Sequence, residues 1–285
     1  MIAIRACHGF DELEASVQLQ IETWGYDASD VVPRKVFLIA QKIGGQVIGA
    51  FDTAVPGATA SATGASNQPR AESMVGFALS LPGVKTGRGE PKAYLHSHML
   101  AVKEIYRNRG LGSQLKLEQR REALSRGIRR MEWTFDPLEI KNAFLNIHRL
   151  GATVSCYRED FYGLSSSRLQ GGLPTDRLLA EWRLDSPRVE GILAGRRQNS
   201  QGQPQIPEGQ PQGSHVIEER ILVPASIYEW KASDTNRERA LTVQLENRRK
   251  FQQAFSQGLA VLDFSRDAEG NGVFELGFLT QTELD

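Results

Sequence analysis

The sequence predicts a mixed α/β fold. Short apolar runs with the character of β-strands alternate with amphipathic stretches at helical spacing, and glycine or proline marks many of the boundaries between them. The composition, with 40% hydrophobic and 24% charged residues, is that of an ordinary globular protein. A length of 285 residues allows one large domain or two small ones.

The chain begins with an expected strand at Ile2–Arg5, which an amphipathic helix follows. Offsets of four, four and three residues place one set of apolar side chains on the buried face of this helix, namely Leu13, Val17, Ile21 and Trp24. A second helix is predicted from Pro33 to the Gly44-Gly45 pair, because proline is favoured at a helix start and glycine just past its end.

Three strands are predicted next, at Val47–Phe51, Met74–Leu81 and Ala93–Val102. Between the first two, residues 53–72 are rich in Ala, Ser, Gly and Thr, which is typical of a mobile surface excursion. The spacing of leucines then predicts a helix at Leu111–Arg126, which Gly127 ends.

The following elements are a strand at Met131–Phe135, a helix around Lys141–Leu150, and strands at Thr153–Tyr157 and Leu178–Leu184. The predicted order for residues 1–185 is therefore β-α-α-β-β-β-α-β-α-β-β, a mixed α/β domain.

The composition changes near residue 195, where GRRQNSQGQPQIPEGQPQGS contains almost no large apolar side chain. Such a segment buries too little apolar surface to order itself, so we expect a flexible linker over residues 186–214. The linker separates the domain of residues 1–185 from a β-α-β-β unit of residues 215–285.

The C-terminal unit is predicted to start with a strand at Val216–Val223. Thr235 and Glu238 form a candidate capping box for its helix, whose expected buried face holds Leu241, Leu245 and Phe255. The sequence DAEGNG predicts a hairpin between strands at Leu259–Phe264 and Val273–Phe278.

Several classes of function are disfavoured. The chain has 34 Lys+Arg against 34 Asp+Glu, whereas a protein that binds nucleic acid by neutralising phosphates shows a basic excess. No stretch approaches the ~18 apolar residues of a membrane span. Cys7 and Cys156 make neither a disulfide framework nor a zinc motif, so we expect a cytoplasmic protein without a metal.

The segment with the clearest chemical meaning is MLAVKEIYRNRGLGSQL, residues 99–115, where a strand leads through a charged turn into a helix. Gly110 and Gly112 at the helix start let unpaired backbone N–H groups point at one spot, where the helix dipole adds positive charge. A pyrophosphate fits such a place, and Arg107 and Arg109 can add charge-assisted contacts. The alternative is a turn whose glycines serve backbone geometry alone.

This segment resembles motif A of the GNAT acyltransferase superfamily, whose R/Q-x-x-G-x-G/A loop binds the pyrophosphate of acyl-CoA. Val102, Tyr106 and Arg107 match the preceding run, and Glu104 replaces its usual proline. The element order of residues 1–185 is also similar to that of the superfamily. The resemblance implies a GNAT-like acyl-CoA acyltransferase fold with a small C-terminal β-α-β-β extension. The residues that it assigns to CoA are Leu100, Ala101 and Val102 for the pantetheine arm, and Arg107, Asn108, Arg109, Gly110, Leu111, Gly112 and Ser113 for the pyrophosphate.

The reaction that the resemblance implies is direct transfer of an acyl group from the CoA thioester to an amine, which needs a base near the amine. His96 and His98 share one face of the strand that enters the loop, because side chains alternate along a strand. His96 lies eleven residues before Arg107, a position that resembles the glutamate base of some GNAT enzymes. The alternative is a pair of hydrogen-bonded structural histidines.

The general acid stays open. Ala143 and Gly151 fit the superfamily's helix pattern, but Ile147 stands where many members have a tyrosine. The candidates that remain are His148, Tyr157, a water molecule or no acid at all, because a thiolate leaves readily. Asn142 and Asn146 on the same helix are candidates for binding CoA or substrate, or surface residues only.

The leading hypothesis is an N-acyltransferase that uses acetyl-CoA or another short acyl-CoA, such as succinyl-CoA, with a small-molecule amine as acceptor. An amino-acid acceptor agrees with the absence of a conspicuous acidic tract, which a basic peptide would favour. The alternatives are a protein or peptide N-acetyltransferase and a non-catalytic acyl-CoA-binding module. The oligomeric state, including a homodimer, is left open by the sequence.

Overall fold

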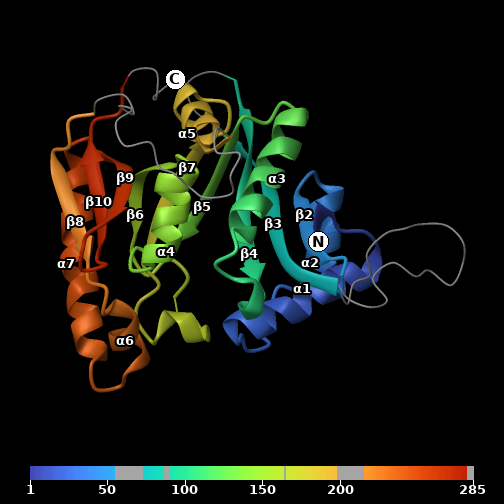
Figure 1. The fold of residues 1–285 in the computed structure, drawn as a ribbon, viewed down its shortest axis with the longest axis horizontal. Helices are drawn as coiled ribbons and strands as arrows, with labels where there is room; N and C mark the ends of the chain where they lie inside the picture. The colour runs from blue at the N-terminus through green and yellow to red at the C-terminus, as the bar shows by residue number, and fades with distance from the viewer. Residues whose placement is uncertain (55–72, 87–89, 164, 198–214, 281–285) are drawn as a thin grey trace, which may run out of the picture. The chain divides into compact units, whose positions relative to one another are not determined.

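The computed structural model describes residues 1–54, 73–86, 90–163, 165–197 and 215–280 (Figure 1). The chain divides into two compact units, the first Met1–Met131 with Ser166–Arg168 and the second Glu132–Ser165 with Leu169–Asp285. The predicted element order of residues 1–185 and the mixed α/β class are both confirmed. Most of the expected surface excursion, at residues 55–72, lies outside the described residues.

The first unit is built on four antiparallel strands in the order β1-β2-β3-β4. Its elements are β1 (Ile2–Ala6), α1 (Gly9–Trp24), α2 (Arg34–Lys42), β2 (Gln46–Asp52), β3 (Met74–Lys85), β4 (Lys92–Val102), the 3-10 turn η2 (Glu104–Tyr106) and α3 (Leu111–Ser125).

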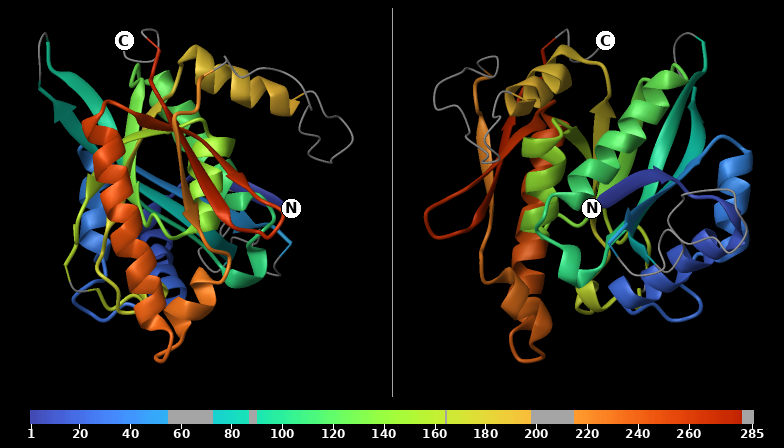
Figure 2. Two further views of the ribbon diagram at one scale, coloured as in Figure 1. Left: turned by 90° about the vertical axis from the view of Figure 1, so that its left-hand side faces the viewer. Right: turned by 45° about the vertical axis from the view of Figure 1, so that its right-hand side comes forward.

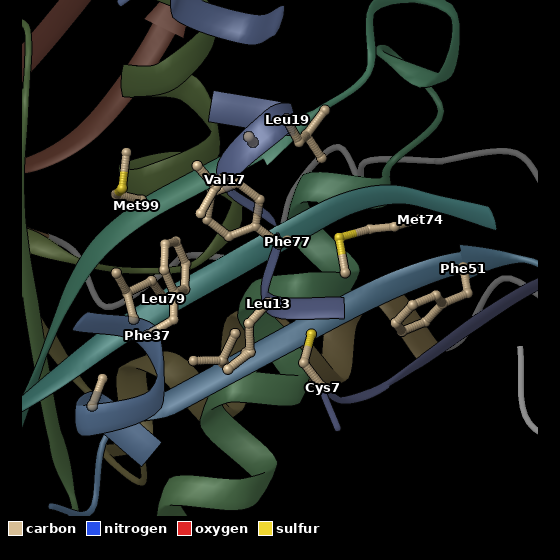
Figure 3. Packing of buried hydrophobic residues seen from close by; sticks show 13 residues of the cluster. Cys7, Leu13, Val17, Leu19, Phe37, Phe51, Met74, Phe77, Leu79 and Met99 are labelled. Atoms are coloured by element: carbon tan, nitrogen blue, oxygen red, sulfur yellow. The ribbon is translucent and has the colours of Figure 1, made fainter. Parts of the chain in front are cut away.

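Successive residues of these strands enter two different clusters, because side chains alternate across a sheet. Val47 and Phe77 belong to the cluster that Figure 3 shows, which includes Leu13 of α1 and Phe37 of α2. Their neighbours Ile48 and Ala78 belong to a second cluster, with Leu111 and Leu115 of α3. Helices α1 and α2 therefore cover one face of the strands, and α3 covers the other.

Strand β4 contains a β-bulge. Leu79 of β3 pairs with Met99 and its neighbour Ser80 pairs with Ser97, so His98 has no partner residue in the register. A bulge bends its strand and redirects the side chains next to it.

The predicted buried face of α1 is partly wrong. Leu13 and Val17 are buried, but Ile21 is 41% exposed and Trp24 only half-buried. Gln20 takes the inner position instead, because its side-chain amide bonds both the N–H and the carbonyl of Val32, at 2.9 and 3.0 Å. A polar residue on the buried face thus fixes the connection to α2.

The second unit has the strand order β5-β7-β6-β9-β10-β8. Its elements are β5 (Arg130–Phe135, beginning in the first unit), α4 (Ile140–Ala143), the π-helical turn η3 (Phe144–Arg149), β6 (Thr153–Arg158), the 3-10 turn η4 (Arg168–Gln170), β7 (Arg177–Arg183), α5 (Pro187–Arg197), β8 (Glu219–Val223), α6 (Ile227–Ala232), α7 (Arg237–Ser256), β9 (Ala260–Arg266) and β10 (Gly272–Gly277). Val154 of β6 pairs with Val261 of β9, so the C-terminal strands continue the sheet of this unit.

Three details of the C-terminal prediction differ from the structure. Helix α5 occupies the first part of the segment expected as linker, and residues 198–214 lie outside the described part of the chain. The predicted capping box is wrong, since Asn236 is the N-cap of α7 and Thr235 bonds Ser233. Helix α6 was not expected, whereas the β9–β10 hairpin is confirmed.

The buried face of α7 is also not the predicted apolar one. It holds Ala240, Gln244, Asn247, Phe251 and Ala254. The helix packs against β6 and β8 (Figure 2), and its polar members are bonded there. Gln244 donates to the Pro174 carbonyl at 2.8 Å and Asn247 to the Leu222 carbonyl at 3.0 Å.

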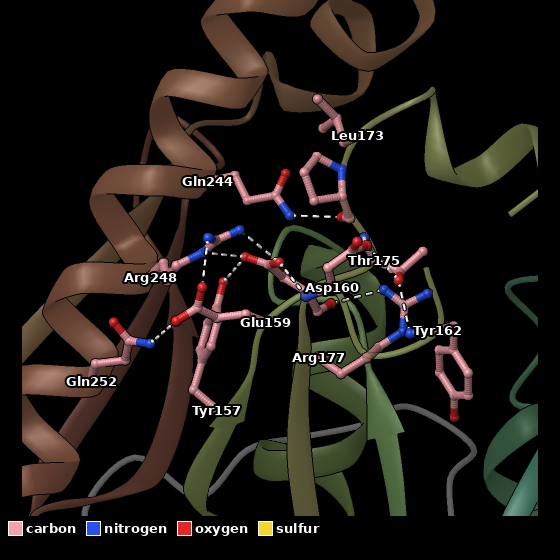
Figure 4. Close-up of polar contacts among 12 residues, drawn as sticks. Tyr157, Glu159, Asp160, Tyr162, Leu173, Thr175, Arg177, Gln244, Arg248 and Gln252 are labelled. Atoms are coloured by element: carbon pink, nitrogen blue, oxygen red, sulfur yellow. Dashed lines mark hydrogen bonds and ion pairs between the residues drawn. The ribbon is translucent and has the colours of Figure 1, made fainter. Parts of the chain in front are cut away.

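Arg248 of α7 adds a charged contact to these hydrogen bonds (Figure 4). Its Nε and Nη2 each bond a different oxygen of Asp176 at 2.9 Å. Asp176 is fully buried and also accepts the Tyr157 hydroxyl at 2.6 Å and the Asp160 N–H at 3.0 Å. The carboxylate therefore joins α7, β6 and the residue that precedes β7.

The substitution Arg248→Met should destabilise the protein, because it leaves the buried Asp176 carboxylate without its cation. Breaking such a pair costs about 3–5 kcal/mol, which lowers Tm by roughly 6–20 °C in a protein of this size. Thermal unfolding measures the effect. Arg249→Met is the matched control, because Arg249 is exposed on the same helix, and equal losses of Tm in both variants would contradict the prediction.

Candidate functional site

The connection from β4 to α3 is a tight turn with two left-handed residues. Tyr106 N–H bonds the Lys103 carbonyl at 2.9 Å, and Arg107 N–H bonds the Glu104 carbonyl at 3.0 Å. Asn108 has φ 60° and Gly110 has φ 76°, a region that favours glycine. A Cβ on Gly110 would meet no protein atom within 4 Å, so the backbone is open at this point.

The N-terminus of α3 offers unpaired backbone donors. Its first helical bond runs from Gln114 N–H to the Gly110 carbonyl at 3.1 Å, and no side chain caps the helix. The N–H groups of Leu111, Gly112 and Ser113 precede this bond, so the helix itself supplies them with no acceptor. Together with the helix dipole, these groups favour an anion.

Arg107, Asn108 and Arg109 are exposed beside this helix start. The Arg107 Nε bonds the Val102 carbonyl at 3.1 Å, which draws the side chain back onto the end of β4. The Arg109 guanidinium lies 5.7 Å from the ring centroid of Tyr106. Tyr106 in turn donates its hydroxyl to Asp52 at 2.7 Å, so the turn is fastened to β2.

The residues expected to lend backbone groups end strand β4. Ala101 pairs with Phe77 and lies in the cluster with α1 and α2, whereas Leu100 and Val102 lie in the cluster with α3. Their side chains are thus committed to the two cores, which leaves only backbone groups for any ligand.

His96 and His98 lie side by side, with ring centroids 6.2 Å apart, as their spacing predicted. His96 pairs with Leu81, a residue that packs against the cluster of α1 and α2. His98 reaches solvent, but the surrounding protein still desolvates its imidazole, and this lowers the pKa of His98 below its ordinary value. The charge of a protonated His96 lowers it further.

Sequence reasoning missed the polar group behind this strand. Lys116 of α3 donates its Nζ to Ser97 Oγ at 2.8 Å, and Ser97 donates to Gln119 Oε1 at 3.0 Å. All three side chains are buried. Helical spacing could have indicated that Lys116 and Gln119 are buried, because they fall on the same face of the helix as Leu111 and Leu115.

The remaining candidates belong to the second unit. Asn142 is exposed on α4, whereas Asn146 is only 3% exposed in the π-helical turn η3. The His148 Nδ1 lies 3.1 Å from Asp263 Oδ1 of β9, and its ring stacks on Phe144 at 4.7 Å. Nothing in the sequence indicated Asp263 as the partner. His148 is therefore oriented by the C-terminal strand of its own unit.

Tyr157, which the sequence left as a candidate acid, and two residues at the end of β5, Trp133 and Asp136, are engaged structurally. Tyr157 donates to Asp176, and burial followed by this bond raises the pKa of its hydroxyl. Trp133 is buried edge-on against Trp182 at 5.9 Å. Asp136 bonds the Leu138 N–H at 2.8 Å and the buried Lys231 at 2.8 Å.

A short loop after β6 presents two aromatic rings. Phe161 and Tyr162 are 49% and 45% exposed and meet edge to face at 4.8 Å. The loop is tied to Thr175, whose side chain bonds Asp160 and the Tyr162 N–H, at 3.1 and 2.9 Å (Figure 4). Arg177 lies 5.4 Å from the Tyr162 ring centroid.

Among the described residues, no group of three or more His, Cys, Asp or Glu is placed to hold a metal ion. No helix in the part of the chain that the structure describes has both the length and the apolar character to cross a membrane.

Known protein families and curated protein sequences give no match to this chain. Solved structures do match. NAA60 from Arabidopsis thaliana, in complex with a bisubstrate analogue, has TM-score 0.49 and 17% identity, covering 64% of this chain and 97% of that chain. The ribosomal-protein-S18-alanine N-acetyltransferase from Escherichia coli has TM-score 0.45 and 15% identity, covering 65% and 94%. A GNAT family acetyltransferase from Elizabethkingia anophelis with acetyl-CoA bound has TM-score 0.40 and 14% identity, covering 64% and 97%.

The Elizabethkingia anophelis protein is named as a member of the superfamily that residues 99–115 of this chain resemble. Each of the three covers about two thirds of this chain and nearly all of its own.

The substitution His96→Gln should raise the pKa of His98, because a neutral amide replaces a group that carries positive charge when protonated. The pKa should stay below the ordinary 6.5, because desolvation is the larger cause of the shift. Titration of ¹³C-labelled histidine by NMR measures this. An unchanged or lower pKa of His98 would show that the two imidazoles do not interact.

Proposed function

We propose that this chain is an acyl-CoA-dependent N-acyltransferase. It transfers an acetyl or other short acyl group, such as succinyl, from the thioester to the primary amine of a small molecule such as an amino acid.

The start of α3 carries this proposal. Three backbone N–H groups with no helical acceptor directly follow a left-handed glycine, Gly110, at which even a methyl group would meet open space. A pyrophosphate needs this combination, because its oxygens accept several N–H bonds only where no side chain keeps them away.

The neighbouring residues supply what an acyl-CoA needs besides these N–H groups, which we call the phosphate cradle. The exposed Arg107 and Arg109 add positive charge next to the N–H groups, and Asn108 lies between them. The backbone of Leu100–Val102 offers amide groups to the pantetheine arm. In the second unit, the exposed Asn142 and the buried Asn146 are the further candidates for binding CoA or substrate.

The co-substrate supplies a thioester carbonyl, and side chains of this chain accept the proton that the acceptor amine loses. A lysine-like amine has a pKa of ~10.4, so it must lose a proton before it attacks. His98 or His96 accepts that proton, and the lowered pKa of His98 keeps its imidazole neutral at pH 7. When the C–N bond forms and the C–S bond breaks, the departing thiolate takes a proton from water.

Gly110→Ala should weaken acetyl-CoA binding by at least about tenfold, because the added methyl group occupies the space through which phosphate oxygens approach. Gly127→Ala is the matched control. Gly127 ends the same helix with the same φ of 76° and equally open surroundings. Both variants should lose about 1–2 kcal/mol of stability. Isothermal titration calorimetry compares their affinities, and equal affinities would overturn the phosphate cradle.

His98→Gln should leave acetyl-CoA affinity unchanged and lower kcat by about 10²–10⁴-fold, the usual contribution of a general base. A screen of amino acids, other small amines and a peptide with a free N-terminus, followed by thiol release, identifies the acceptor. His8→Gln is the control, because His8 is exposed and distant in sequence from the turn. Acylation of peptides alone would identify a peptide N-acetyltransferase, and acetyl-CoA binding without any turnover would identify a binding module.

A further inference from the structure

We propose that Lys116 is a positioning residue, which sets the β4 bulge and thereby the His98 imidazole through Ser97 and Gln119. The proposal rests on the proposed function, because His98 is the base that would be positioned.

The contacts run from α3 to the residue before the bulge. Lys116 Nζ donates to Ser97 Oγ at 2.8 Å, and the same hydroxyl donates to Gln119 Oε1 at 3.0 Å. The exposed fractions of Lys116, Ser97 and Gln119 are 4%, 5% and 0%. Ser97 is thus held by two side chains of one helix, and the next residue is His98.

The network continues to the partner strand at the same level. Ser80 is the residue that pairs with Ser97, and its hydroxyl donates to Gln46 Oε1 at 2.9 Å. Gln46 Nε2 donates in turn to the Gln119 carbonyl at 2.8 Å. Both strands are therefore pinned to α3 at the last regular pair before the bulge. A bulge interrupts the backbone hydrogen bonds between the two strands, so side-chain hydrogen bonds must fix the position of the strand there.

Ser97 and the two histidines lie on opposite faces of β4. Ser97 meets Lys116 on the α3 side. His96 pairs with Leu81, which packs on the side of α1 and α2, and His98 lies beside His96. A shift of Ser97 on one face would therefore move the imidazole of His98 on the other, since adjacent residues share one backbone.

A lysine is a costly choice for this place. Burial of the amine lowers the pKa of Lys116 well below its ordinary value, because desolvation penalises the charged form. A methionine has a similar length and flexibility and carries no group to desolvate. If packing were the only role of the side chain, methionine would serve it better.

The test compares Lys116→Met with Gln114→Met, an exposed position on the same helix. We expect Lys116→Met to keep or raise Tm, to bind acetyl-CoA as the wild type does, and to lower kcat about 10- to 100-fold through misplacement of the base. The ¹³Cε1 resonance of His98 should move in Lys116→Met, while those of His148 and His215 stay in place. Gln114→Met should change none of these values.

Ser97→Ala keeps the proposal testable should Lys116→Met fail to fold, and it should move the same His98 resonance. An unmoved His98 resonance and an unchanged kcat in the folded Lys116→Met variant would overturn the proposal. Failure of the wild type to bind acetyl-CoA would instead overturn the proposed function, and the His98 resonance would still report whether Lys116 positions the bulge.

Discussion

A helix that begins at an uncapped, left-handed glycine leaves its first N–H groups without partners, and α3 begins in this way at Gly110. The same helix buries Leu111 and Leu115 against β2, β3 and β4. Apolar packing thus fixes the position of α3, and with it the position of the uncapped N-terminus of this helix. The anion site that we propose is a consequence of where the core holds this helix.

Helix α3 also reaches the strand that carries the two histidines. Lys116 and Gln119 bond Ser97 from inside the unit, at the place where β4 departs from regular pairing. One helix therefore offers N–H donors at its first turn and, through Lys116 and Gln119 further along, bonds the strand next to the bulge. Because one helix contacts both places, this rigid element sets the distance between the loop before α3 and His98.

The C-terminal segment has a comparable role in the second unit. Arg248 of α7 neutralises the buried Asp176, Asp263 of β9 orients His148, and Lys231 of α6 bonds both Asp136 and Glu139 at 2.8 and 2.9 Å. Each tie joins a C-terminal element to residues between β5 and β7. These residues therefore complete the unit, since a buried carboxylate without its cation is strongly destabilising.

The sequence by itself determined the order of elements over residues 1–185, the hairpin of β9 and β10, and the glycine turn before α3. These features follow from local rules, because apolar periodicity, proline and glycine act within a few residues. Only the tertiary structure decided the buried faces of α1 and α7, where Gln20, Gln244 and Asn247 displace the expected apolar side chains. It also decided the partners of Ser97, His148 and Asp176, because a polar side chain is buried only where a distant residue completes its hydrogen bonds.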